Sequence, residues 1–378
     1  MEGDASSDIE CDVVVVGGGL AGSAVASVLG RRGMTVAVVD RHAEFPPIFR
    51  AEKIESDQAA LLRKLGLFDG VLERTRIINE IIHGQRGRIV HRRQIEQFGI
   101  SYCDLVNSVR QQIPAAVDFV VGVVASVQAG DRRSRVTLVD GRCFAGRLVV
   151  IASGMNSPVA VELGARKQMV KEGLSTTFGF MLQRSDDQPF SFDAVTYRPS
   201  SINDQLGYLT LFRMGAFMRA NLFTYWPVSD PKTRELRTDP VGFLARTLAG
   251  LETVIGEFKV AGRVETFGID LYRMENCAIP GVVFLGDAYQ SVCPSTGMGL
   301  SKVLTDVDVL CNELVPTWRG LERIRSEETA ALYSNPRKVQ IDDRAVRLAL
   351  AGRDSVLSTA LAWRIRRRVR TLRFSQGW

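Results

Sequence analysis

Glycines and acids recur at two predicted strand ends that lie far apart in the chain. The first segment, Gly17-Gly18-Gly19-Leu20-Ala21-Gly22, is a G-x-G-x-x-G pattern that follows a β-branched run. In such a pattern the first glycine permits a tight turn, the second admits a pyrophosphate, and the third lets helix and strand pack closely. The pyrophosphate sits on the free N–H groups of the helix. Asp40 ends the next apolar run, where an acid accepts hydrogen bonds from ribose hydroxyls and repels a 2′-phosphate. The pattern predicts FAD or NAD.

The second segment, GVVFLGDAYQSVCPSTGMGL, decides between these two dinucleotides. An apolar strand ends at Gly286-Asp287, and a helix begins after Pro294 with Gly297-Met298-Gly299. The ribityl-flavin half of FAD needs such a separate piece of chain, and Asp287 can accept hydrogen bonds from ribityl hydroxyls. A helix N-terminus beside the flavin would stabilise negative charge on the reduced ring. The pair of segments favours FAD.

The elements that position these residues follow from hydrophobic patterning. Val13–Val16 and Thr35–Val39 are typical of strands buried on both faces, with a helix from Ala21 to Arg32 that ends at Gly33, which together form a βαβ unit. Helices are predicted over residues 57–72 and 100–114, and strands over Phe119–Val127, Arg135–Val139 and Leu148–Ile151. An Asp140-Gly141 hairpin turn joins the last two strands.

Residues from about 170 to 275 are aromatic-rich and alternate in polarity, which is typical of an antiparallel sheet, with one helix from Pro240 to Ile255. The predicted fold is therefore α/β: a Rossmann-like FAD-binding domain with an inserted antiparallel-sheet substrate domain and C-terminal helices. We expect the FAD-binding domain at 1–168 and 277–330, the substrate domain at 169–276, and a helical region with a basic tail at 331–378.

Composition excludes several classes of protein. The chain has 378 residues, of which 46% are hydrophobic and 24% charged, as in a globular enzyme. Six scattered cysteines and three histidines do not predict a metal site or disulfide framework. The acidic N-terminus does not resemble a leader, and no apolar run reaches the roughly 18–20 residues of a membrane span, so we expect a cytoplasmic protein.

Basic charge is concentrated in the tail. From Arg353 onward there are seven arginines against one aspartate, which equals the net charge of +6 of the whole chain. We therefore expect no specific binding of nucleic acid. Apolar residues at helical spacing accompany these arginines: Leu357, Leu361, Ile365, Val369 and Leu372. Such a helix can dock on the protein's own surface or contact an anionic membrane.

With GGGLAG, Arg50-Ala51 and GDAYQSVCPSTGMGLSKVLTD, the chain resembles the class A flavoprotein monooxygenases, the para-hydroxybenzoate hydroxylase family. The resemblance implies that reduced FAD captures dioxygen as a flavin hydroperoxide and transfers one oxygen atom to a small molecule, by hydroxylation or epoxidation of an aromatic or polyketide-like substrate. It also implies that Arg50 contacts FAD and that Asp306 lies inside the helix after the glycine turn. The candidate cofactor-binding residues are Gly17, Gly19, Leu20, Ala21, Gly22, Asp40, Arg41, Arg50, Val124, Ala152, Ser153, Gly154, Gly286, Asp287, Pro294, Gly297, Met298, Gly299 and Leu300.

Departures from the family pattern concern the electron donor. Ser153 replaces an acid and Ala160 an arginine in the segment that the family links to FAD and NAD(P)H, and Tyr102 stands where a flavin-contacting arginine is usual. The donor is therefore open between NADH or NADPH and a separate flavin reductase.

No catalytic acid or base stands out in the sequence, and aromatic residues of the inserted sheet are the candidates for the substrate wall. They are Phe180, Tyr197, Tyr208, Phe212, Phe223 and Tyr225. At a period of two residues, about half of such side chains face away from a given side. Arg213 and Arg219 could pair with an acidic substrate. The alternatives are a geranylgeranyl-reductase-like flavoprotein, suggested by Leu222–Lys232, and a non-catalytic flavoprotein.

Overall fold

The β-branched run near the N-terminus forms the centre of a largely parallel sheet in the computed structural model, which describes residues 8–50, 53–214 and 217–363. The strand order is β6-β2-β1-β9-β8-β7, with β15 also paired to β9. The strands are β1 Ile9–Val16, β2 Val36–Asp40, β6 Asp118–Val121, β7 Val124–Gln128, β8 Ser134–Leu138, β9 Cys143–Ile151 and β15 Val282–Phe284. Only the β7–β8–β9 pairings are antiparallel.

Both faces of this sheet are covered, which explains the uninterrupted valines of β1. Val13 and Val15 belong to the core shared with α1 (Leu20–Gly30), α4 (Tyr102–Arg110) and α9 (Met298–Asp308), whereas Val14 and Val16 belong to the core on the other face. A strand buried on both sides needs apolar residues at every position rather than at alternate ones.

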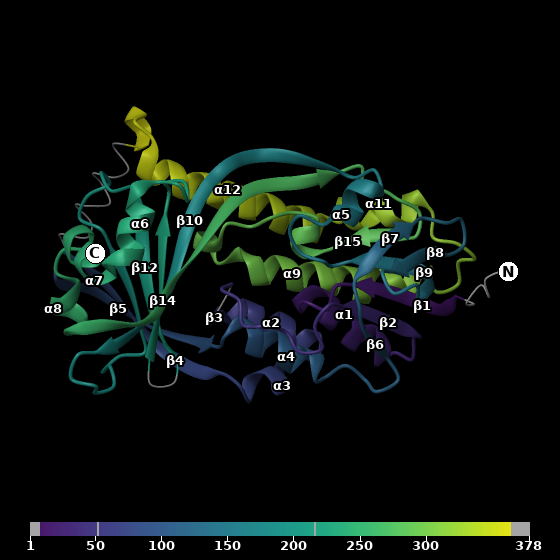
Figure 1. Ribbon diagram of the computed structural model, residues 1–378, viewed down its shortest axis with the longest axis horizontal. Helices are drawn as coiled ribbons and strands as arrows, with labels where there is room; N and C mark the ends of the chain where they lie inside the picture. The colour runs from purple at the N-terminus through teal and green to yellow at the C-terminus, as the bar shows by residue number, and fades with distance from the viewer. Residues whose placement is uncertain (1–7, 51–52, 215–216, 364–378) are drawn as a thin grey trace.

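The second sheet is curled and mostly antiparallel, in the order β14-β10-β13-β12-β11-β4-β5-β3, with a parallel contact only between β11 and β4. Its strands are β3 Lys53–Ile54, β4 Arg76–Gln85, β5 Arg88–Gly99, β10 Arg166–Arg184, β11 Ala194–Arg198, β12 Leu206–Met214, β13 Phe217–Thr224 and β14 Phe258–Glu275. The long strands β10 and β14 arch from the parallel sheet to the second sheet (Figure 1). They join the two halves of the molecule.

Three short helices cover one face of the second sheet. The core of this region includes Trp226, Phe178 and Tyr197, all fully buried, and residues of α6 Pro231–Thr238, α7 Pro240–Thr247 and α8 Leu251–Ile255. The remaining helices are α2 Ser56–Lys64, α3 Phe68–Leu72, α5 Pro158–Glu162, α10 Val315–Trp318, α11 Ser326–Ser334 and α12 Pro336–Leu357. On the other face, α12 packs against β10 and β12 near Tyr208 and Tyr225.

The α/β class and the inserted antiparallel sheet are confirmed, but three predicted elements are broken. Residues 119–127 form two strands, because β6 pairs with β2 while β7 turns at Gly122 to pair with β8. The helix predicted over 57–72 is divided near Gly66, which adopts a left-handed φ of 68°. The helix predicted from Pro240 to Ile255 is divided at Gly250, where an added Cβ would lie 2.5 Å from the Cα of Gly87.

The second sheet also takes strands from the region that the sequence analysis left within the first domain. β4 and β5 form a hairpin whose turn, Arg86-Gly87, has positive φ at both positions, as in a type I′ turn. Many side chains of β5 are exposed arginines or glutamines, so the hydrophobic alternation that marks a strand is weak there. The arginine-rich tail from Arg364 onward, including Ile365, Val369 and Leu372, lies outside the described residues.

Candidate active site

The first glycine-rich turn has the geometry that its sequence predicts. Gly17 has φ of 103°, and an added Cβ would lie 2.6 Å from the carbonyl oxygen of Ala152. At Gly22 an added Cβ would lie 1.9 Å from the Gly17 oxygen, so helix and strand could not pack as they do. Around the Cβ position of Gly19, in contrast, there is no atom within 4 Å, and α1 begins there without a side-chain cap. The turn thus leaves backbone N–H groups facing open space.

Asp40, at the end of β2, is already held by the protein. Its Oδ2 accepts a hydrogen bond from the N–H of Gly18 at 2.7 Å, and its Oδ1 accepts one from His42 at 2.8 Å. Arg110, at the end of α4, lies 3.2 Å from Oδ1 and donates through Nε to the carbonyl of Gly18. The sequence analysis missed Arg110. It fastens the acid to the glycine turn, and ribose binding by Asp40 remains a prediction.

The second glycine-rich segment brings Asp287 opposite Arg50. The guanidinium of Arg50 lies 2.9 Å from Oδ2 of Asp287 and stacks on the ring of Phe267. Gly297 has φ of 68° and begins α9 without a side-chain cap, while Gly299 has open space around its Cβ position. Gln58, which sequence reasoning also missed, donates to the carbonyl of Gly297 at 3.0 Å. Its place in a Glu55–Gln58 capping box of α2 was a usable signal.

A cavity of about 250 Å3, here called the inner cavity, joins these cofactor candidates to the second sheet. Predicted residues that line it are Leu20, Arg50, Asp287, Pro294, Gly297, Gly299, Leu300, Tyr208, Phe212 and Phe223. Further lining residues on the sheet side, which the sequence analysis did not name, are Phe49, Thr177, Thr210, Asn221 and Phe267. The cavity therefore extends from the candidate cofactor-binding residues to aromatic side chains of the second sheet.

The other predicted residues lie elsewhere. Phe180 and Tyr197 do not line the inner cavity, because they point to the helix-covered face of the sheet. Tyr225 lines an outer cavity of about 340 Å3 that shares Tyr208 and Thr296 with the inner one. The remaining cofactor candidates are Gly17, Ala21, Gly22, Asp40, Arg41, Val124, Ala152, Ser153, Gly154, Gly286 and Met298, which surround the glycine turns and strand ends without lining the inner cavity.

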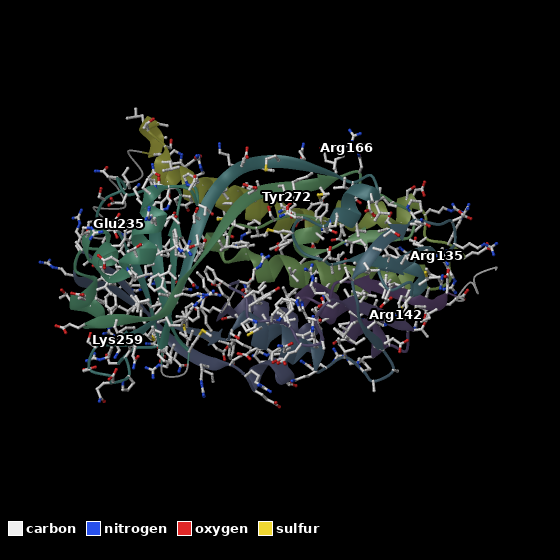
Figure 2. The ribbon with its side chains drawn as sticks, in the orientation of Figure 1. Arg135, Arg142, Arg166, Glu235, Lys259 and Tyr272 are labelled. Atoms are coloured by element: carbon white, nitrogen blue, oxygen red, sulfur yellow. The ribbon has the colours of Figure 1, made fainter. Side chains whose placement is uncertain are left out.

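Two tyrosines lie near Asp287. In Figure 2, Tyr272 lies near the middle of the molecule, whereas labelled charged side chains such as Arg135 and Lys259 lie toward its two ends. Tyr272 donates its hydroxyl proton to the carbonyl oxygen of Asp287 at 2.7 Å. Tyr102, at the start of α4, lines the inner cavity, and burial raises its pKa to about 12. The tyrosines near Asp287 therefore stay neutral and act as hydrogen-bonding groups.

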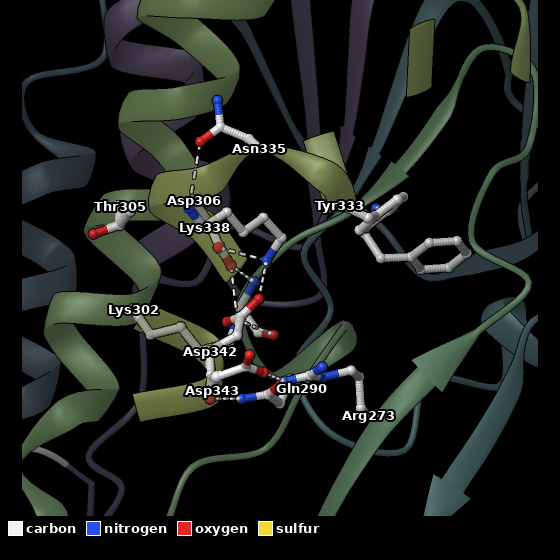
Figure 3. A network of polar contacts seen from close by, with 12 residues as sticks. Arg273, Gln290, Lys302, Thr305, Asp306, Tyr333, Asn335, Lys338, Asp342 and Asp343 are labelled. Atoms are coloured by element: carbon white, nitrogen blue, oxygen red, sulfur yellow. Dashed lines mark hydrogen bonds and ion pairs between the residues drawn. The ribbon is translucent and has the colours of Figure 1, made fainter. Parts of the chain in front are cut away.

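Beneath Asp287 lies a buried charge network formed by Lys302, Asp306, Lys338 and Asp342 (Figure 3). Asp306 accepts hydrogen bonds from Lys302 at 2.8 Å and from Lys338 at 2.7 Å. The same carboxylate accepts one from the N–H of Gly286 at 2.9 Å. Burial alone would raise the pKa of Asp306, but the two ammonium groups lower it below the ordinary value. The network thus ties α9 and α12 to the turn that carries Asp287.

A protein-family model covers most of this chain. The model described as "FAD binding domain" matches residues 10–337. The chain belongs to the FAD-binding domain family. Among solved structures, p-nitrophenol 4-monooxygenase from Pseudomonas putida has a TM-score of 0.76 at 18% identity, covering 95% of this chain and 92% of that one. Pseudomonas aeruginosa PqsL in complex with 2-aminobenzoylacetate has a TM-score of 0.71 at 21% identity, covering 91% and 97%.

Curated relatives of this family member are distant. Mouse squalene monooxygenase is 26% identical over 333 residues, which cover 78% of this chain and 53% of that protein. The ubiquinone hydroxylase UbiL of Rhodospirillum rubrum is 25% identical over 347 residues, covering 84% and 75%. The chain spans about half the length of the mouse and rat squalene monooxygenases.

The residues of this chain fit the FAD for which its family is named. Two helix N-termini without side-chain caps, at Gly19 and Gly297, supply N–H groups for a pyrophosphate and for the flavin edge. Open space at the Cβ positions of Gly19 and Gly299 admits a ligand against the backbone. Asp287 supplies an acceptor for hydroxyl groups. Among the described residues no cluster of His, Cys, Asp or Glu could hold a metal, and no helix is long and apolar enough to cross a membrane.

Proposed function

We propose that this chain is an FAD-dependent monooxygenase that inserts one oxygen atom from dioxygen into a small molecule with aromatic or polyketide-like rings. The observation that supports this most directly is the inner cavity, which runs from the Arg50–Asp287 pair and Gly297–Leu300 to Phe212 and Phe223. A site for an oxidising cofactor and an aromatic substrate wall would therefore share one cavity.

Bound FAD would supply the oxygen chemistry, and the chain's own residues would do the rest. The N-terminus of α9 faces the inner cavity through Gly297 and Gly299, so its positive end would stabilise negative charge on a ring lying there. Phe49, Phe223 and Phe267 line the cavity with apolar surface, which excludes water from the reacting groups.

The two alternatives from the sequence receive less support. The segment Leu222–Lys232, which suggested a geranylgeranyl-reductase-like enzyme, places Trp226 in the sheet core, where its Nε1 donates to Thr233. This tryptophan packs against Phe178 and does not reach the cavity. A non-catalytic flavoprotein would not need an aromatic wall that shares a cavity with the cofactor candidates.

The electron donor belongs to the same proposal. Ser153 is exposed, and Ala160 is buried within α5, so neither offers a charged group to a nicotinamide cofactor. We propose NADH or NADPH as the source of electrons, delivered directly or through a separate flavin reductase. Oxidation of NADH and of NADPH by the purified protein, with and without an added reductase, distinguishes these routes.

The central test follows the oxygen atom. The flavin that co-purifies with the chain is identified by mass spectrometry, photoreduced, and mixed with 18O2 and a panel of hydroxylated aromatics. We expect product that has gained one heavy oxygen atom. Release of peroxide alone with every compound would favour the non-catalytic alternative, and reduction of an isoprenoid double bond without dioxygen would favour the reductase.

A further inference from the structure

The floor of the inner cavity is a patch of three adjacent strands, β10, β13 and β12. Across these strands, Thr177 pairs with Phe223, which is adjacent to Tyr208, and Asn221 pairs directly with Thr210. All five side chains line the inner cavity. Because residues two apart on a strand share a face, aromatic and polar positions alternate on the same surface.

Two polar atoms on this floor are buried without a hydrogen-bond partner among the described residues: Oγ1 of Thr177 and Oδ1 of Asn221. The residues are 1% and 8% exposed. Leaving a buried polar atom without a partner destabilises the fold, so such atoms in a cavity wall indicate a partner that enters the cavity. Thr177 and Asn221 are diagonal neighbours on paired strands, and both side chains line the inner cavity.

Charged groups around the inner cavity are already paired with each other. Arg50 lies 2.9 Å from Asp287, and Lys53 lies 3.6 Å from Glu55. These four are the charged residues among the described lining, and they sum to no net charge. Arg213 and Arg219, which the sequence analysis suggested as partners of an acidic substrate, already have partners in the protein. Arg213 donates to the carbonyls of Phe190 and Phe192, and Arg219 pairs with Glu265 at 2.9 Å.

Resting on the proposed function, we propose that Thr177 and Asn221 together bind an uncharged hydroxyl group on the ring system of the substrate. A hydroxyl can donate its proton to Oδ1 of Asn221 and accept the proton of the Thr177 hydroxyl, so one group satisfies both atoms. The flanking rings of Phe223 and Tyr208 then pack against the substrate ring. This assigns a hydroxylated, neutral aromatic substrate, and it disfavours hydrocarbons and carboxylates.

The test compares three ligands with one ring skeleton: 2-naphthol, naphthalene and 2-naphthoate, titrated by calorimetry into the oxidised, FAD-loaded protein at neutral pH. The variants are Thr177→Val and Asn221→Leu, which keep side-chain shape and remove hydrogen bonding. The control is Thr266→Val, because the Thr266 hydroxyl is also buried and unpartnered in the described structure but pairs with Phe178, whose side chain lies in the helix-covered core. The readout is the ratio of the naphthalene and 2-naphthol dissociation constants within each variant, which is insensitive to partial unfolding.

We expect wild-type protein and Thr266→Val to prefer 2-naphthol over both other ligands. In each cavity variant, the ratio of the naphthalene to the 2-naphthol dissociation constant should fall about three- to tenfold, with naphthalene binding unchanged. Equal binding of 2-naphthol and naphthalene by the wild type, or an unchanged preference in either variant, would mean that the two residues do not bind the hydroxyl together and would overturn the proposal. Tightest binding of 2-naphthoate, no saturable binding of 2-naphthol, or the same loss in Thr266→Val would also overturn it.

These titrations involve no reductant and no turnover, so their result is separate from that of the oxygen-transfer test. If the binding preference holds and no heavy oxygen is incorporated, the monooxygenase proposal fails alone. If oxygen is transferred to hydrocarbons or carboxylates as readily as to hydroxylated rings, the assignment of substrate class fails alone.

Discussion

Lys338, in the first turn of helix α12, should be among the costliest side chains to remove. Its ammonium lies 2.7 Å from Oδ1 of Asp306 and 3.0 Å from Oδ2 of Asp342, and its side chain is fully buried. Lys338→Met would leave two buried carboxylates to share Lys302. Removing one partner of a buried ion pair typically costs about 3–5 kcal/mol. With an unfolding entropy of about 2.1 cal/mol/K per residue, that loss lowers Tm by about 4–6 °C for a chain of 378 residues that unfolds as one unit.

Calorimetry on the flavin-free protein measures this loss without a contribution from cofactor binding. Arg337→Met on the same helix is the matched control, because Arg337 is 41% exposed and its partner Asp308 keeps Lys64 at 2.7 Å. We expect the control to cost about 1 kcal/mol or less. The double variant Lys338→Met/Asp342→Leu removes one charge of each sign and should recover much of the loss. A single variant as stable as the control, or a double variant at least as unstable as the single one, would refute the reasoning.

The same network makes a prediction about pH. The ammonium groups of Lys302 and Lys338 outweigh burial and lower the pKa of Asp306 below its ordinary value of 3.8. The unfolded chain therefore binds this proton more readily, so the stabilisation is present above about pH 4 and is lost as pH falls through the lowered pKa. The difference in Tm between wild type and Asp306→Asn should be largest near neutral pH and should shrink in acid. A difference independent of pH would contradict this.

Four further substitutions test the cofactor site and its wall. Gly19→Ala should lower FAD affinity while leaving the Tm of the flavin-free protein nearly unchanged, whereas Gly22→Ala, whose Cβ would meet the Gly17 oxygen at 1.9 Å, should prevent stable folding. Arg50→Met should weaken FAD binding in a flavin-fluorescence titration, because Asp287 loses its cation at 2.9 Å; unchanged affinity would contradict the assignment. Tyr208→Phe removes one hydrogen bond, to the Ser295 carbonyl, and should cost about 0.5–1.5 kcal/mol in urea unfolding.

Local patterns predicted the FAD-binding half of the fold well. The glycine turn, the strand that ends at Asp40 and the turn at Gly141 follow from backbone sterics and from a strand buried on both faces, which act over a few residues. The sequence analysis did not predict the β4–β5 hairpin, because many exposed polar side chains in β5 obscure the alternation of apolar and polar residues that identifies a strand. Its Arg86-Gly87 turn was the remaining signal.

By itself, the sequence predicted a flavin site at two remote glycine-rich segments and an aromatic antiparallel sheet between them, because both patterns are local. Only the tertiary structure decided which aromatic residues reach the cavity, since a period of two residues divides a strand into faces without saying which face is covered by helices. It also decided that Arg110 holds Asp40, and that Lys338 joins Asp306 beneath Asp287. Such partners are brought together by packing between distant elements, and no local pattern encodes that distance.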